Sequence, residues 1–369
     1  MPRNRVIYQS EALFVSDGTL APTAAHPSGN IKQLHRVQSA NYGFSISRQN
    51  INQFGNLAKI DSIIMEAPTV TLDFTYYLHD GTNETTLGFT TGANASGAPS
   101  FISGLLDASA ISVVSGRNFH ILTVPEGNDA NGAGSSVTNS INSNTITIGN
   151  GFITNYSVEA AVGAIPTVSV GVEGLNINVI SGSSGLNPSL VIETSTTGGN
   201  LFALPNAVTG DVGVSALRPG DISLTVEDGY IADLPTADSG NTAAHIQSFS
   251  IELPIGRSTL QRIGNSFGYA KVIDFPVEAT VNISATVAEL KDSGILSSVI
   301  TSDATKTLTF QFKNPAGNSK ITYTVKGAKI VSENFSSSIG DNKTVDLVFT
   351  TQIGGPQDST NGVFVGVAP

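Results

Sequence analysis

Side chains that commonly carry chemistry are spread thinly along this sequence. There is no cysteine, and the five histidines stand singly, with no partner at metal-ligand spacing: His26, His35, His79, His120 and His245. Asp73 and Asp80 lie on or beside a strand-like segment, without a nearby second carboxylate to complete an acid/base pair. The chain also lacks a nucleophile elbow, a phosphate-binding loop and a dinucleotide motif. We therefore expect no catalytic, cofactor or metal site, and no enzyme activity.

The informative residues are instead an arginine, a glycine and an asparagine that occur twice in the same frame. Val37 to Asn56 lies without a gap over Ile246 to Asn265, at an offset of 209 residues. The identical pairs are Gln38/Gln247, Ser39/Ser248, Arg48/Arg257, Gly55/Gly264 and Asn56/Asn265.

Two interpretations of this frame stay open. In the structural one, the glycines form turns with positive φ, and the arginines cover apolar surface or pair with a carboxylate. In the functional one, the turn and its arginine meet a neighbouring copy. The candidate inter-subunit contacts are then Arg48, Gly55, Asn56, Arg257, Gly264 and Asn265.

A second shared block indicates that a whole domain is present twice. Ile153 to Val172 lies over Ile330 to Phe349 at an offset of 177, and its apolar column keeps the period of two that places side chains on one face of a strand. Because the offset falls from 209 to 177, the first copy carries 32 extra residues between its two blocks.

The coarse pattern predicts a strand-rich unit with one helix per copy. Thr69 to Leu78 alternates, and Asn83 to Phe89 is expected as a short strand. The helix candidates are Ser100 to Ser109 in the first copy and Val287 to Ile300 in the second. We thus expect a mainly β protein of two tandem β-sandwich or rolled-sheet domains, each with one flanking α-helix.

The expected division of the chain is a first domain at 1–180, a linker at 181–214 and a second domain at 215–369 with a C-terminal arm. Three segments are polar and rich in glycine: Glu126 to Asn144, Ser181 to Val214 and Gly354 to Pro369. Such segments bury too little apolar surface in an isolated subunit to compensate for the entropy that they would lose on becoming ordered. We expect some of these segments to be mobile in the free protein and to become ordered between stacked rings.

Charge and hydrophobicity limit the classes of partner that we expect for this chain. The 369 residues have a net charge of −11, and Asn118 to Gly256 contains twelve acidic residues against one basic residue, Arg218. A basic surface for gripping nucleic acid is thus not expected, and the acidic middle would repel phosphate or simply aid solubility. The N-terminus has no apolar core of signal-peptide length, and no stretch is long and apolar enough for a membrane helix, so we expect a soluble protein.

The order of these parts resembles the tail tube (major tail) proteins of long-tailed bacteriophages. The shared features are an early "VQS" or "IQS" strand, an arginine-to-glycine loop near "LG" or "FGN", a strand that begins with proline, one helix, and a final strand pair. The most similar piece is "GFITNYSVEAAVGAIPTVSVGVEG" at Gly151 to Gly174. The linker and the 32-residue excess are unlike a minimal tube domain.

This resemblance implies a structural virion protein made in the host bacterial cytoplasm. Three duplicated chains would form a ring of six domains, and stacked rings would form the tail tube, through which DNA is ejected without specific binding. The implied partners are further copies of the chain and the tape measure, terminator and distal tail proteins, with no cofactor and no membrane. A distal tail ring, a capsid decoration protein and a carbohydrate-active sandwich enzyme remain the alternatives.

Overall fold

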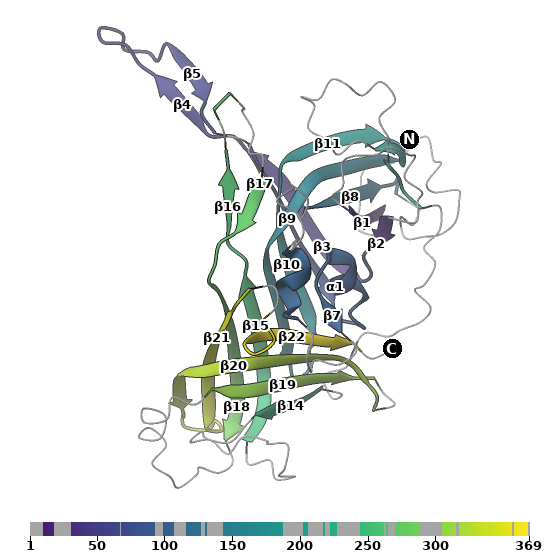
Figure 1. Ribbon diagram of the computed structural model, residues 1–369, viewed down its shortest axis with the longest axis vertical. Helices are drawn as coiled ribbons and strands as arrows, with labels where there is room; N and C mark the ends of the chain where they lie inside the picture. The colour runs from purple at the N-terminus through teal and green to yellow at the C-terminus, as the bar shows by residue number, and fades with distance from the viewer. Residues whose placement is uncertain are drawn as a thin grey trace.

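The protein is mainly β, as the alternating pattern predicts. The computed structural model describes residues 10–17, 31–66, 68–92, 99–106, 116–126, 130, 143–186, 202–205, 217, 222–226, 244–261, 263–264, 270–287, 305–314, 317–355 and 358–367. Sixteen of the strands belong to one sheet (Figure 1). Three further pairs of strands stand apart from it.

Eight strands form a continuous antiparallel array at the centre of the molecule. Their order is β3, β6, β10, β9, β15, β18, β21, β20. The bounds are β3 Val37–Ser45, β6 Thr69–Tyr77, β10 Thr167–Gly174, β9 Asn144–Ala161, β15 Ala244–Pro254, β18 Val277–Val287, β21 Thr344–Ile353 and β20 Ser319–Ser336. The first four strands come from the first sequence copy and the last four from the second, so the two copies share one sheet.

The two longest strands, β9 and β20, each continue into a side sheet of their own copy. The N-terminal half of β9 pairs with β8 (Arg117–Thr123) and β11 (Asn176–Ser181), and β8 pairs with β1 (Glu11–Asp17), which pairs with β2 (Ile31–Gln33). The N-terminal half of β20 pairs with β19 (Lys306–Lys313) and β22 (Gly362–Val367), and β19 pairs with β14 (Ile222–Val226). Each copy is therefore a bent sheet built on the same plan.

Strand registers agree with the sequence offsets pair by pair. Ser39 lies opposite Thr75, and Ser248 lies opposite Ser284, which preserves the offset of 209 on both strands. Thr167 lies opposite Glu159, and Thr344 lies opposite Ser336, which preserves the offset of 177. The register shifts recur as well, one at Gln38 and Gln247 and another at Thr154 and Val331. Because a bulge is a fixed structural feature, its repetition supports a duplicated domain.

One apolar core runs through both copies. On β6, Val70, Leu72, Phe74 and Tyr76 point into it, while the alternate residues lie on the opposite face. A smaller cluster covers the outer side of β1 and β8, where Phe14 and Leu122 meet Leu186 and Leu204. These last two belong to the expected linker, which contributes the strand pair β12 (Ser184–Leu186) and β13 (Phe202–Ala203).

Several sequence predictions are corrected here. Asn83 to Phe89 is not a strand, because Thr82–Leu87 forms the short helix α1 between two glycines in the left-handed conformation. Phe101–Leu105 of the first helix candidate forms a 3-10 helix rather than an α-helix. Val287 is the last residue of β18, and the rest of the second helix candidate lies outside the described residues.

The C-terminal segment is not a free arm. Gly362–Val367 forms β22, which pairs with β20 and is mostly buried, so it belongs to the core of the second copy. β22 also pairs in parallel with β7 (Thr91–Gly92) of the first copy. Most of Glu126 to Asn144 lies outside the described residues. The domain boundaries stay predictions, since one continuous sheet spans both copies.

Candidate assembly surfaces

The duplicated arginine and glycine frame the two hairpins that leave the central array. The first hairpin pairs β4 (Arg48–Ile51) with β5 (Asp61–Ile64), and the second pairs β16 (Arg257–Leu260) with β17 (Ala270–Ile273). The first hairpin projects away from the body of the molecule (Figure 1). Their registers are identical under the offset of 209, with Arg48 opposite Ile64 and Arg257 opposite Ile273.

Each hairpin ends in a turn that contains its duplicated glycine. Gly55 has φ +90° and Gly264 has φ +87°, which confirms that these turns need the left-handed conformation. No atom lies within 4 Å of a Cβ built on either glycine, so the space beside each glycine is open. Asn56 is exposed beside Gly55, and Asn265 lies outside the described residues.

Both hairpins expose large apolar side chains. Phe54 and Leu57 of the first turn are fully exposed, as is Ile263 of the second. The remaining exposed apolar residues of the two hairpins are Ile51, Ile60, Ile63, Ile64, Met65, Leu260 and Val272. An isolated exposed leucine is common, but a cluster of this size at the end of a projecting hairpin is typical of a surface that binds another protein.

The joint between the two copies shows how one copy accepts the next. Strands β9 and β15 pair in antiparallel fashion from Ser248 opposite Ala161 to Pro254 opposite Asn155. Backbone hydrogen bonds continue this ladder at both ends, from Val162 N to Gln247 O and from Ile255 N to Thr154 O, each 2.8 Å.

Side chains of the second hairpin strengthen this joint. Arg257 donates from Nε to the carbonyl oxygen of Ile153 at 3.0 Å, and its guanidinium lies over the ring of Phe152, 5.3 Å from the centroid. Lys271 donates from Nζ to the carboxylate of Glu173 on β10. Burial lowers the pKa of Arg257 to about 10, against the opposing effect of the nearby Glu173, so the group stays charged at neutral pH.

The equivalent surfaces at the outer ends of the array have no partner strand among the described residues. β3 pairs with β6 on one side only, and the C-terminal half of β20 pairs with β21 on one side only. Arg48, the counterpart of Arg257, is exposed at the open end. The structure thus brings Arg257 into a contact between copies, whereas a contact of Arg48, Gly55, Asn56, Gly264 or Asn265 with a neighbouring chain stays a prediction.

The face of the central array opposite the core is polar and acidic. Its strands present mostly serine, threonine and asparagine, and cross-strand partners place six carboxylates on it: Asp73, Glu159, Glu173, Glu252, Glu278 and Asp346. Among the described residues of these eight strands, Lys329, opposite Thr350, is the one lysine or arginine on this face. Three of the six carboxylates belong to the acidic stretch between Asn118 and Gly256.

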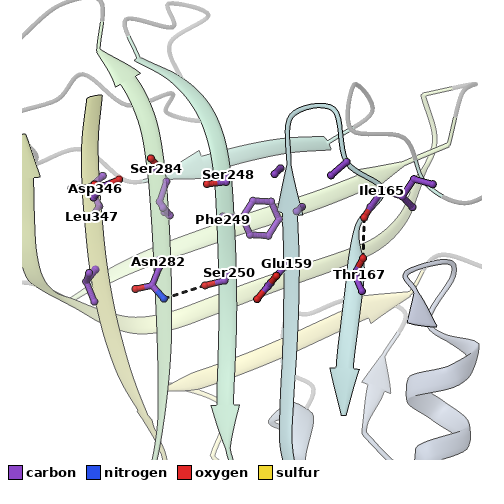
Figure 2. Close-up of a pocket in the computed structure, with 15 residues that line it drawn as sticks. Glu159, Ile165, Thr167, Ser248, Phe249, Ser250, Asn282, Ser284, Asp346 and Leu347 are labelled. Carbon is purple, nitrogen blue, oxygen red and sulfur yellow. Dashed lines mark hydrogen bonds between the residues drawn. The ribbon is translucent and has the colours of Figure 1, made fainter. Parts of the chain in front are cut away.

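A shallow groove of about 390 Å³ crosses this face where the two copies meet (Figure 2). Glu159, Ser250, Asn282 and Asp346 line it, and Asn282 donates a hydrogen bond to Ser250. Hydroxyl, amide and carboxylate groups without a cation offer no grip on a phosphate, so the groove has the wrong charge for a nucleic-acid site.

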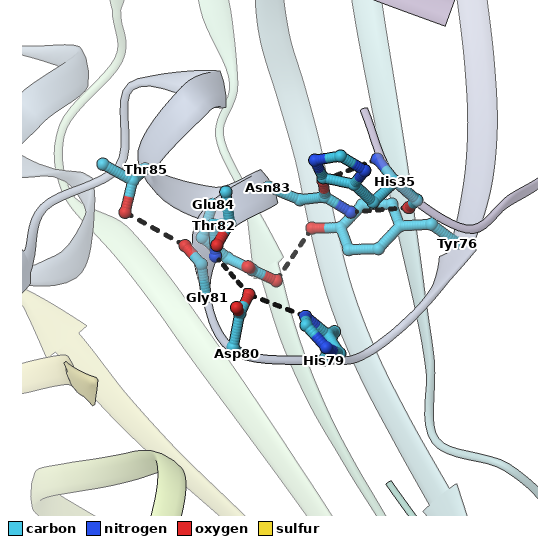
Figure 3. Close-up of polar contacts among 9 residues, drawn as sticks. All are labelled: His35, Tyr76, His79, Asp80, Gly81, Thr82, Asn83, Glu84 and Thr85. Atoms are coloured by element: carbon cyan, nitrogen blue, oxygen red, sulfur yellow. Dashed lines mark hydrogen bonds and ion pairs between the residues drawn. The ribbon is translucent and has the colours of Figure 1, made fainter. Parts of the chain in front are cut away.

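A buried polar cluster ties the two copies together behind this face (Figure 3 shows Tyr76 and Glu84 of this cluster). Tyr76 and Tyr156 each donate to Oε1 of Glu84, at 2.9 and 3.2 Å. Tyr156 and Tyr323 of the second copy are 2.8 Å apart, and because the one proton of Tyr156 goes to Glu84, Tyr323 must be the donor. Burial raises the pKa of Glu84, whose side chain is almost fully enclosed.

Hydrogen bonds hold Asp80 in the neighbouring turn. Burial acts to raise the pKa of Asp80, but hydrogen bonds from His79 and Thr82 outweigh it and hold that pKa far below its usual range. Among the described residues, no group of three or more histidine, aspartate or glutamate side chains has an arrangement that could hold a metal ion. In the same part of the chain, no helix has the length and apolar character of a membrane span.

Sequence reasoning missed Phe152, Glu173 and Lys271, which hold the joint, and Glu84, which is buried in the polar cluster. Glu173 and Lys271 are 98 residues apart, so no local pattern pairs them. Glu84 stands in a run of polar residues, and only the fold places two tyrosine hydroxyls beside it.

Comparisons with known proteins give little further guidance. No family model and no curated protein matches the sequence. Among solved structures, the chain is similar to the tube-terminating cap of the anti-feeding prophage, determined by cryo-EM. That similarity has 13% sequence identity and a TM-score of 0.28, and it covers 43% of this chain and 97% of the cap protein.

Proposed function

We propose that this chain is a structural subunit of a bacteriophage tail or a tail-like particle. In this proposal three chains close into a ring of six similar copies, and the rings stack into a hollow tube. The proposal rests on one observation, the joint between β9 and β15, in which one copy extends the sheet of the other edge to edge.

The same joint can be repeated between chains. The offset of 209 relates β15 to β3, and the offset of 177 relates β9 to β20. Transferred in this way, the register between β9 and β15 predicts that β3 pairs with β20 of the next chain, with Tyr42 opposite Phe335 and Gly43 opposite Asn334. This contact is heterologous, because it uses two different edges, and heterologous contacts close into rings when the rotation per subunit permits. Closure would also cover the two strand edges that otherwise invite aggregation.

The projecting hairpins suit contacts along the tube axis. The two hairpins follow β3 and β15 in the chain, and both extend from the same end of these strands. Both hairpins carry exposed apolar residues. A ring built from this chain therefore carries six apolar hairpins on one rim, which would dock onto the opposite rim of the next ring. Such a head-to-tail contact does not close, and it generates a filament.

The polar face would line the lumen. Its carboxylates repel phosphate, and its short polar side chains present no apolar patch to a passing molecule. This character suits a conduit for DNA that is not bound on the way. The tape measure, terminator and distal tail proteins are the further partners that this role implies.

Electron microscopy and native mass spectrometry of the purified protein test the proposal together. We expect particles of three chains at low concentration and hollow tubes at high concentration. Rings of six chains, or a monomer at every concentration, would contradict it. A three-chain ring that never stacks would favour a terminal ring or a decoration protein instead.

A further inference from the structure

The two hairpins occupy equivalent positions but differ in the residues at their bases. In the second hairpin, Lys271 forms an ion pair with Glu173 across the joint, and only 6% of its side chain is exposed. Arg257 adds a backbone hydrogen bond and lies over the ring of Phe152. The joint within the chain therefore has two side-chain anchors in addition to its strand ladder.

The offsets assign a counterpart to each of these residues at the joint between chains. Arg48 stands for Arg257, so the arginine is retained. Ser62 stands for Lys271, and the registers support this, because Ser62 lies opposite Asn50 and Lys271 lies opposite Thr259.

The receiving surface differs in the same way. Thr350 stands for Glu173, because it lies opposite Lys329 as Glu173 lies opposite Phe152. Lys329 thus stands for Phe152, and Arg48 would approach an ammonium group where Arg257 approaches an aromatic ring. The ion pair and the aromatic contact are both missing from this set of residues.

We propose that one chain receives the next through a weakened copy of its internal joint. The donor surface is β3 with the first hairpin, and the acceptor surface is the edge of β20 with the neighbouring β21 of a second copy of the chain. Besides the strand ladder and cross-strand neighbours such as Tyr42 opposite Phe335, this joint keeps the Arg48 contact with the carbonyl oxygen of Ile330. Among the described residues it lacks a counterpart of the Lys271–Glu173 ion pair and of the Arg257–Phe152 contact. The inference rests on the proposed ring.

This arrangement determines where the ring comes apart. A ring of six copies then opens at the three joints between chains and not at the three joints within them. Salt screens both attraction and repulsion between charges. The joint between chains lacks the attractive ion pair and brings two positive charges, Arg48 and Lys329, close together. Moderate salt therefore does not weaken this joint.

The test installs the missing ion pair in the full-length chain. The variant Ser62→Lys with Thr350→Glu is compared with the parent and with each single substitution, and ring dissociation is followed by sedimentation at decreasing protein concentration. For a partly buried ion pair we expect the concentration at half-dissociation to fall about tenfold in the double variant but not in either single variant. The gain should shrink as salt is raised. Lys329→Phe, which restores an aromatic ring, should also tighten the ring.

The outcomes separate this inference from the proposed function. If the parent forms three-chain rings but the double variant and Lys329→Phe dissociate at the same concentration as the parent, the weakened joint is wrong and the ring stands. If neither parent nor variants form rings while circular dichroism reports a folded β protein, the proposed function itself fails.

Discussion

Replacing Glu84 probes the cluster that joins the two copies. Glu84→Ala removes an acceptor that is 1% exposed and receives hydrogen bonds from Tyr76 and Tyr156. A buried hydroxyl donor left without its acceptor costs about 1–3 kcal/mol, so removing the acceptor of two tyrosines destabilises the fold by about 2–6 kcal/mol. That is a large part of the roughly 5–15 kcal/mol that stabilises a typical protein.

Glu84→Gln is the matched control, because its amide oxygen accepts both hydrogen bonds without a charge. Urea unfolding, followed by circular dichroism at a concentration where the chain is monomeric, measures both variants. At neutral pH we expect the Ala variant to unfold at clearly lower urea, and the Gln variant to unfold near the parent.

The pH dependence provides an independent readout of the same carboxyl group. Because burial raises the pKa of Glu84 in the folded state, its contribution to stability is fully present below the unfolded pKa of about 4.3 and is lost as the pH rises through the folded value. The stability of the parent relative to the Gln variant should therefore fall between mildly acidic and neutral pH. An Ala variant as stable as the parent, or a difference between parent and Gln variant that is constant with pH, would refute the role given to Glu84.

Three further predictions concern the assembly surfaces. Ala40→Pro removes a backbone donor at the open edge of β3, so subunits should fold but form no rings. The control variant Ala40→Ser should assemble normally. Native mass spectrometry measures ring formation, and rings of the Pro variant would show that this edge is not the contact between chains. Phe54→Ser with Leu57→Ser should leave rings intact but prevent tubes, and micrographs with tubes of parental length would contradict the stacking role. Arg257→Ala should destabilise the monomer by about 2 kcal/mol, because one hydrogen bond and one cation–π contact are lost. Urea unfolding measures this change. An unchanged unfolding midpoint would show that Arg257 does not stabilise the joint.

The choice of Ala40 follows from the ladder between β9 and β15. Val162 N donates to Gln247 O, and Ile255 N, just after β15, donates to Thr154 O. Alternate residues from Gln247 onward along β15 therefore form their backbone hydrogen bonds with β9. The offset of 209 transfers this pattern to the even-numbered residues of β3, among them Ala40. A proline there keeps the bonds to β6, because edge strands tolerate proline where the N–H faces outward.

Periodicity and repetition predicted most of the strand plan. The alternation of Val70, Leu72, Phe74 and Tyr76 identified β6 and its buried face. The offsets predicted a domain present twice, which the matching registers of β3 with β6 and of β15 with β18 support. A positive φ at Gly55 and Gly264 was also accessible, since a duplicated glycine marks a backbone conformation that other residues rarely adopt.

What the sequence did not reveal depends on contacts between distant segments. Helix α1 has six residues, too few for a helical period to appear. The pattern of residues 354–369 predicts an arm that carries a short apolar strand at Val363 to Val367; the strand is confirmed as β22, but its pairing with β20 makes it part of the core rather than of an arm. The shared sheet was likewise not predictable, because either copy could have closed its own edge.

A joint made inside one chain changes the kinetics of any ring that uses it. The two copies meet at an effective concentration set by the connecting segment and not by the amount of protein in solution. A ring of six separate copies must bring six bodies together, and its yield falls steeply as the protein is diluted. With β9 and β15 joined in advance, only three bodies have to meet, so the proposed ring forms from fewer encounters and at a lower protein concentration.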